Sequence, residues 1–348
     1  MRKLFTMVAA LAGLAAGKAG AQDMLINGAG ATFPAPLYMK WFSEYHAAHP
    51  NLQFNYQSIG SGGGIQQFTA GTVDFGATDA AMLPAELEKA PDVVHIPTVL
   101  GAVVVTYNVE GLASLKLTPE ALAGIFLGKV KKWNDPAIAS ANAGAKLPDV
   151  EIAVMHRADG SGTTNIFTEY LSKVSPEWKA GPGTGKSVSW PVGLGGKGNE
   201  GVTGLVKQTP GAIGYVELAY AKQNNLPVAA LKNKAGAFVT PTIATTSAAA
   251  AGVVLPADFH DVSSISATNA DGKDAYPIAA FTYLLVHRDA KDAAKGKALV
   301  EFLSWAVHDG QRFAEPLDYA PLPKPAVEKI SKAIGALTVM GKPVASAH

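Results

Sequence analysis

Three times along this chain, a strand pattern ends in a short turn of glycine and hydroxyl residues that opens directly into a helical pattern. The turns lie at residues 27–36, 58–64 and 156–164. Strands that alternate with helices in this way are typical of α/β folds. A helix start leaves N–H groups without backbone partners and carries partial positive charge, so it attracts anions. The repeated pattern therefore predicts an α/β fold with an anion site at one side of a sheet.

The third turn carries the most chemistry. An apolar run ends at Met155, and Ser161 then stands at the N-cap position of an amphipathic helix. Arg157 adds a permanently charged fork that suits a tetrahedral oxyanion, and Asp159 can hold this fork in place. Taken alone, the same residues also fit a capped surface helix with an ordinary Arg–Asp ion pair.

The first two turns and a third strand end place more polar groups on the same side. Thr32 and Phe33 lie on a glycine-rich loop that feeds a helix, and Ser61 opens a second helix. Asp79 follows the strand pattern at 72–77. Ligands in α/β sheets bind at the carboxyl ends of strands, which favours one shared site. The alternatives are glycines chosen for turn geometry alone and an Asp79 that only caps the next helix.

The amino-terminal residues 1–21 read as a secretory signal peptide. Basic residues precede an apolar run over 4–16, and small residues at 19–21 provide a cleavage site. We therefore expect a mature chain that begins at Gln22. No later apolar stretch reaches the roughly 18 residues of a membrane helix, and the chain has no cysteine. These features predict a soluble protein of the bacterial periplasm.

Removal of the leader leaves 327 of the 348 residues, a length that suits two domains. It also leaves 26 of the 29 basic residues against 28 acidic ones, a formal charge of −2. A chain so close to neutral is no general binder of polyanions, so we expect no nucleic acid partner. Any anion must be held by local groups.

The three glycine and hydroxyl turns, together with Asp79 and Arg157, form a combination that resembles the phosphate-binding proteins of ABC phosphate importers, the PstS family. The resemblance runs along nearly the whole mature chain. The segments that carry it are GAGATFPAPLY (28–38), YQSIGSGGG (56–64), TVDFGATDA (72–80), LGKVKKWNDPAI (127–138), RADGSGTTNIFTEYL (157–171), GLGGKGNEGV (193–202) and PGAIGYVELAYAKQ (210–223).

The resemblance implies an α/β periplasmic binding protein of type II, with two domains, each a mixed sheet flanked by helices, and a ligand cleft between them. Domain 1 would comprise residues 22–103 and 282–348, and domain 2 would comprise 104–281. Candidate crossings between the domains are the apolar strands at 101–107 and 281–286.

The resemblance also implies the ligand, the partner and the site. Inorganic phosphate would be captured and passed to an inner-membrane ABC permease by a monomer that needs no cofactor or metal. Asp159 would pair with Arg157 rather than touch the ligand. Gly62 stands where some family members have a second serine, so the auxiliary hydroxyl of those members is absent here. The implied phosphate contacts are Thr32, Phe33, Ser61, Asp79, Arg157, Ser161, Gly162 and Thr163.

Two other function classes remain open at this stage. A secreted phosphoryl-transfer enzyme would need a metal cluster or an activated nucleophile, and the sequence shows neither. A receptor for sulfate or molybdate is disfavoured by Asp79, because a buried carboxylate repels a fully ionised anion but accepts the proton of a phosphate.

Two further patterns are weaker. The glycine-rich segment 180–187 matches a relaxed nucleotide-binding loop but lacks the preceding strand and following helix. His46 and His49 could approach a metal from one helix, although solvated surface histidines explain them as well.

Overall fold

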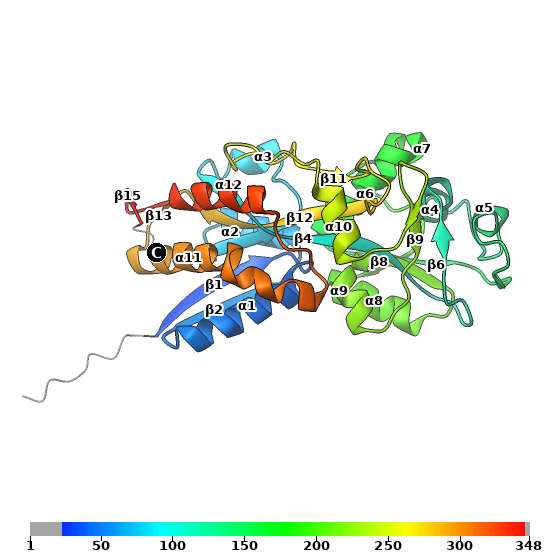
Figure 1. The fold of residues 1–348 in the computed structure, drawn as a ribbon, viewed down its shortest axis with the longest axis horizontal. Coiled ribbons are helices and arrows are strands. Elements are labelled where there is room, and N and C mark those ends of the chain that lie inside the picture. The colour runs from blue at the N-terminus through cyan, green and yellow to red at the C-terminus, as the bar shows by residue number, and fades with distance from the viewer. Residues whose placement is uncertain (1–22, 345–348) are drawn as a thin grey trace, which may run out of the picture.

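The computed structural model describes residues 23–344, so the predicted signal peptide lies outside the described chain. A nine-stranded mixed sheet runs along this elongated part of the molecule, with helices packed around it (Figure 1). This confirms the predicted α/β class. The strand order is β2-β1-β3-β12-β4-β8-β6-β7, with β11 paired to β12. The strands are β1 (Met24–Gly30), β2 (Leu52–Ser58), β3 (Phe75–Thr78), β4 (Val93–Asn108), β6 (Ala153–Arg157), β7 (Leu194–Gly196), β8 (Ala212–Glu217), β11 (Ala267–Thr268) and β12 (Ile278–His287).

The long strand β4 joins the two ends of the sheet. Its residues 93–102 pair antiparallel with β12, and residues 103–108 pair antiparallel with β8. Every residue of β4 except the last is buried, as expected for a strand covered on both faces. The segments predicted as crossings, 101–107 and 281–286, lie within β4 and β12. The domain boundaries after residues 103 and 281 remain a prediction.

The first group of strands, β2-β1-β3, lies at one end of the sheet, next to β12. Within it, β1 is parallel to both β2 and β3, and β3 is antiparallel to β12. The buried face of α1 is strongly aromatic, and its Phe42 packs against Phe302 of α11 with ring centroids 5.4 Å apart. The helices on this side are α1 (Ala35–Ala48), α2 (Ser61–Thr69), α3 (Pro84–Leu87), α11 (Ala293–Val307), η1 (Asp309–Phe313), η2 (Glu315–Leu317) and α12 (Lys324–Gly335), with a small sheet of β13 (Asp289–Ala290), β14 (Thr338–Val339) and β15 (Lys342–Pro343).

The second group of strands is β8-β6-β7, all mutually parallel where they pair. Side-chain caps define several of its helix starts, since Thr118 caps α4 and Ser161 caps α6. The helices here are α4 (Pro119–Phe126), α5 (Pro136–Ala139), α6 (Gly162–Val174), α7 (Pro176–Ala180), α8 (Gly198–Gln208), α9 (Leu218–Gln223) and α10 (Ile243–Ala250), with a small sheet of β5 (Lys116–Leu117), β9 (Ala230–Lys232) and β10 (Phe238–Val239).

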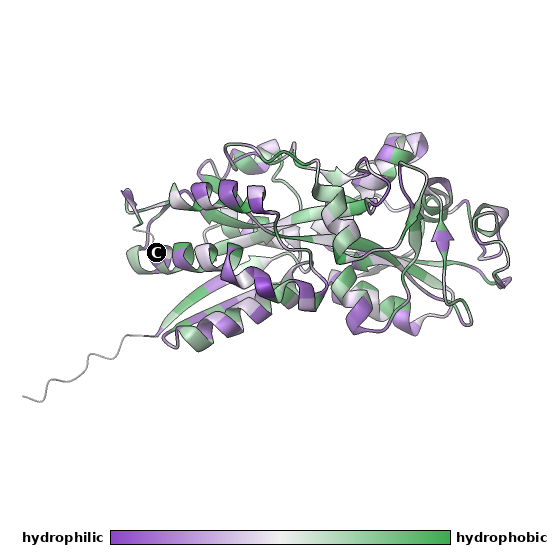
Figure 2. Ribbon diagram, viewed as in Figure 1, coloured by the Kyte–Doolittle hydropathy of each residue, from purple (hydrophilic) through white to green (hydrophobic). Residues whose placement is uncertain are grey.

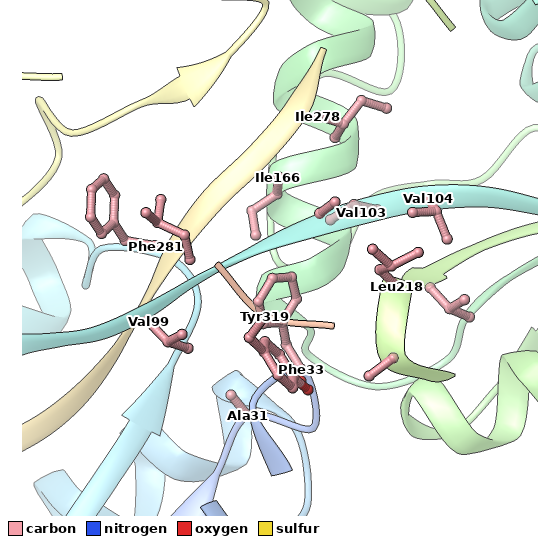
Figure 3. Close-up of a cluster of buried hydrophobic side chains, with 14 of the residues drawn as sticks. Ala31, Phe33, Val99, Val103, Val104, Ile166, Leu218, Ile278, Phe281 and Tyr319 are labelled. Carbon is pink, nitrogen blue, oxygen red and sulfur yellow. The ribbon is translucent and has the colours of Figure 1, made fainter. Parts of the chain in front are cut away.

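The hydrophobic core is continuous between the two groups. Hydrophobic residues follow the central strands, whereas the outer helices carry polar stretches (Figure 2). Near the paired strands β4 and β12, Phe33 and Tyr319 pack together in this core with ring centroids 6.4 Å apart (Figure 3). No helix within residues 23–344 is both long and apolar enough to cross a lipid bilayer.

Candidate anion-binding site

The structure brings all the predicted site residues together where the two groups of strands meet. Strands β1, β2 and β3 lead into the segments that hold Thr32, Ser61 and Asp79, and β6 ends at Arg157. All the predicted contact residues are buried. The starts of α2 and α6 face each other, because the N–H of Gly62 donates to the carbonyl of Gly160 at 2.9 Å.

The cation of the site is Arg157, which forms an ion pair with Asp159. Arg157 donates through Nε and Nη2 to the two oxygens of Asp159, at 2.8 and 2.5 Å. Desolvation opposes the charge of Asp159, but the hydrogen bonds and charge of Arg157 and the N–H of Gly198 outweigh it and lower the pKa of this carboxyl. The Arg157 side chain is only 1% exposed. The pair is therefore a buried feature, and the alternative of an ordinary surface pair is wrong.

The guanidinium retains donors after this pairing. A further N–H of Arg157, on Nη1, reaches Thr163 Oγ1 at 3.3 Å. Three of the five N–H groups are then used, and the other two have no partner within the described residues. A buried cation with spare donors suits an anionic ligand.

Asp79 is the only predicted contact with a carboxyl group, and its environment differs from that of Asp159. It accepts from Thr282 Oγ1 at 2.8 Å and from Ser61 Oγ at 3.3 Å. Burial raises the pKa of Asp79 to about 7, although the hydrogen bond from Thr282, the charge of Arg157 and the bond from Ser61 act against this rise. Helix α3, the next in the chain, begins at Pro84, and its N-cap residue is Leu83 rather than Asp79. The alternative role as a helix cap is therefore wrong.

The start of α6 supplies backbone donors. Ser161 Oγ accepts from the N–H of Thr164 at 3.0 Å, as predicted for an N-cap. Within residues 23–344, the N–H groups of Gly162 and Thr163 have no hydrogen-bond partner. A Cβ on Gly162 would lie 2.5 Å from Ser61 Oγ and 2.6 Å from Asp79 Cβ. Only glycine allows the α6 start to approach the other strand group this closely.

Three tyrosines hold the loop after β1. Tyr56, Tyr220 and Tyr319 donate to the successive carbonyl oxygens of residues 31, 32 and 33, at 2.7, 2.6 and 2.6 Å. In a planar trans peptide the N–H points opposite to the C=O. The carbonyls are thus turned toward the tyrosines, and the N–H groups of Thr32 and Phe33 face the other way.

Several residues at the site were missed by the sequence analysis. Thr282 comes from β12, and the strand pattern did not show that its hydroxyl faces Asp79. Asn199 lies at the start of α8 and bonds to Thr32 Oγ1. Its signal was present, because the segment 193–202 repeats the sequence of strand, glycine turn and helix that identified the other turns.

The structure also shows the surroundings of the two weaker sequence patterns, the segment 180–187 and the pair of His46 and His49. The segment 181–187 follows α7 rather than a strand and opens no helix, so it lacks the strand–loop–helix context of a nucleotide-binding loop, as predicted. Lys186 in this segment accepts from the N–H of Ser161 through its carbonyl and forms an ion pair with Glu86 at 2.7 Å. His46 bonds to the carbonyl of Leu52, and no cluster of metal-binding side chains occurs in the described chain.

The fold and this polar convergence between two strand groups define a periplasmic-binding-protein class. In agreement, the PBP superfamily domain matches residues 15–309. Over 311 residues the chain is 49% identical to the phosphate-binding protein PstS of Pasteurella multocida, with 89% of each chain covered. It is 48% identical over 313 residues to PstS of Xylella fastidiosa strain Temecula1, covering 89% of this chain and 84% of that one. The chain therefore belongs to the PstS family of phosphate-binding proteins.

Solved structures agree on the fold. The phosphate-binding protein of Stenotrophomonas maltophilia superposes with a TM-score of 0.69 at 20% identity, covering 89% of this chain and 93% of that one. This similarity supports the type II binding-protein fold that the sequence analysis predicted.

Proposed function

We propose that this protein captures inorganic phosphate in the periplasm and delivers it to an inner-membrane ABC permease for import. The observation that carries this proposal is the buried convergence of unpaired donors on one side and a single carboxyl on the other. Arg157 and the start of α6 supply donors for phosphate oxygens. Asp79 supplies the acceptor for the proton that phosphate keeps at neutral pH.

In this arrangement, the N–H groups and hydroxyls of Thr32, Phe33, Ser61, Ser161, Gly162 and Thr163 complete the set of phosphate contacts. Asp159 holds Arg157 and does not touch the ligand. Sulfate binds weakly because it brings no proton to Asp79, so two anionic oxygens would face each other unless Asp79 first took up a proton. Relatives named as phosphate-binding proteins support this ligand. We further propose that the protein is a monomer and that it catalyses no reaction.

The test is calorimetric titration of ligand-stripped protein with phosphate, sulfate and arsenate. We expect phosphate to bind in a one-to-one ratio and sulfate to bind far more weakly. A parallel assay with a generic phosphate ester should release no product. Product release that scales with protein and disappears in an Arg157→Leu variant would identify an enzyme instead.

A further inference from the structure

One buried amide joins the two groups of strands at the proposed site. Asn199 is fully buried at the start of α8. Its side-chain Nδ2 donates to Thr32 Oγ1 at 2.7 Å and to Thr163 Oγ1 at 3.2 Å. Thr32 follows β1 and Thr163 lies in the first turn of α6. A single side chain therefore contacts a hydroxyl from each group.

The orientation of this amide is fixed by a backbone donor. The N–H of Glu217 donates to Asn199 Oδ1 at 2.9 Å. Because a backbone N–H can only donate, the amide oxygen must face Glu217 and the NH₂ group must face the two hydroxyls. Asn199 also donates to Thr32 Oγ1 through its own backbone N–H, at 3.1 Å.

These contacts fill the acceptor capacity of both hydroxyls. A hydroxyl oxygen has two lone pairs and one hydrogen. Thr32 Oγ1 accepts from the backbone N–H and from Nδ2 of Asn199, and Thr163 Oγ1 accepts from Nδ2 of Asn199 and from Arg157. Each hydroxyl can then act further only as a donor. Within residues 23–344, neither hydrogen has an acceptor.

We propose that Asn199 is a positioning residue that turns the hydroxyl hydrogens of Thr32 and Thr163 toward the bound anion. This inference rests on the proposed function, because phosphate oxygens would be the missing acceptors. Two hydroxyls that can only donate favour unprotonated oxygens at these points, because an anionic oxygen accepts a stronger hydrogen bond than a protonated one. The ligand proton is thereby directed to the oxygen that faces Asp79, so Asn199 helps to select how phosphate is oriented.

The first test compares two buried asparagines. Asn199→Ala should weaken phosphate binding roughly 10- to 100-fold, the scale for unpaired or misdirected buried hydrogen bonds. The control is Asn233→Ala, since Asn233 is also buried but its side-chain Nδ2 donates only to the carbonyls of Gly272, Lys273 and Ala275. The control should lower the melting temperature and leave the phosphate Kd within about threefold of the parent.

A double-mutant cycle separates positioning from general packing. If Asn199 acts through the hydroxyl of Thr32, the double variant Asn199→Ala, Thr32→Val should lose little more phosphate affinity than the more damaging of the two single variants. The inference would be overturned if the affinity losses of the two single variants multiplied in the double variant, or if Asn199→Ala had a parent-like Kd. Either result would leave the proposed function intact. A parent protein that binds no phosphate would overturn both.

A shape-conserving variant covers the case in which Asn199→Ala does not fold. Asn199→Asp keeps the acceptor for the N–H of Glu217 but replaces the donor NH₂ with an oxygen. That oxygen would attract both hydroxyl hydrogens, so phosphate affinity should fall at least as far as in Asn199→Ala. Parent-like affinity in Asn199→Asp would contradict the inference.

Discussion

The two groups of strands contribute opposite chemistry to one site. The β1-β2-β3 group supplies Asp79, whose carboxyl bonds to two hydroxyls and has a pKa raised to about 7 by burial. The β6 strand supplies Arg157 together with Asp159, whose pKa is lowered. Both carboxyls are largely buried, yet their pKa values shift in opposite directions because Asp159 is bonded to a cation, whereas Asp79 is bonded to hydroxyls. The immediate partner, rather than burial alone, therefore decides the direction in which the pKa of a buried acid shifts.

The largest expected effect comes from removing the cation. Arg157→Leu should weaken phosphate binding by about 2–5 kcal/mol, because it deletes the ligand's charge partner and leaves Asp159 unpaired. Titration calorimetry measures the change. The control is Arg288→Leu, which breaks an exposed pair with Asp258 and should leave phosphate affinity unchanged. Affinity within about threefold of the parent would place Arg157 outside the site.

The next test removes the charge of the unpaired acid. Asp79→Asn keeps the shape and adds N–H donors, so phosphate should still bind while sulfate gains a donor in place of repulsion. We expect the phosphate-to-sulfate affinity ratio to fall about a hundredfold, within the range available to sites that demand a particular hydrogen bond. Competition titrations at neutral pH measure the ratio.

Asp74→Asn makes the same chemical change away from the site, where Asp74 pairs with Lys295. It should leave the ratio unaltered. An unchanged ratio in Asp79→Asn as well would remove Asp79 from ligand selection and abolish the contrast between the two groups.

A third change tests how closely the two groups must approach. In Gly162→Ala the new methyl would collide with Ser61 and Asp79. Overpacking of this kind costs about 1–3 kcal/mol, and phosphate affinity should fall accordingly. Gly204→Ala in α8 is the matched control, since a Cβ there meets open space. Equal phosphate affinity in the two variants would show that binding does not require this contact.

The smallest expected effect is a pH dependence of stability in the ligand-free protein. Because the folded-state pKa of Asp79 is raised to about 7 from 3.8, its contribution is fully present below the unfolded pKa and is lost as pH rises through 7. Between about pH 6 and pH 8, the parent should lose about 1 kcal/mol relative to Asp79→Asn. Denaturant unfolding of both proteins at each pH measures this difference. Parallel pH profiles would show that Asp79 is ionised throughout.

Much of the site was predictable because its parts recur as one local pattern. Thr32, Ser61 and Ser161 each follow a strand and precede a helix, so sequence order alone placed them at one side of the sheet. The Arg157–Asp159 pairing was also expected, as the two lie close in the chain.

The missed residues act through contacts that sequence distance hides. Thr282 reaches Asp79 from 203 positions away, and Asn199 reaches Thr32 from 167 positions away. By contrast, the amphipathic helix expected after Ser161 is α6, and its Ile166, Phe167 and Leu171 are buried. Apolar spacing predicts such packing well, whereas the partner of a buried polar group depends on how distant strands are brought together.

The three tyrosine bonds to the loop after β1 have a consequence for the thermodynamics of capture. A peptide flip at Thr32 would carry a carbonyl dipole toward the anion, and the phenol groups of Tyr56 and Tyr220 oppose such a flip. The loop is therefore ordered during folding of the chain rather than on arrival of the ligand. Conformational freedom that has already been removed is not lost again on association. The entropy of phosphate uptake should thus be dominated by released water, with little contribution from this loop.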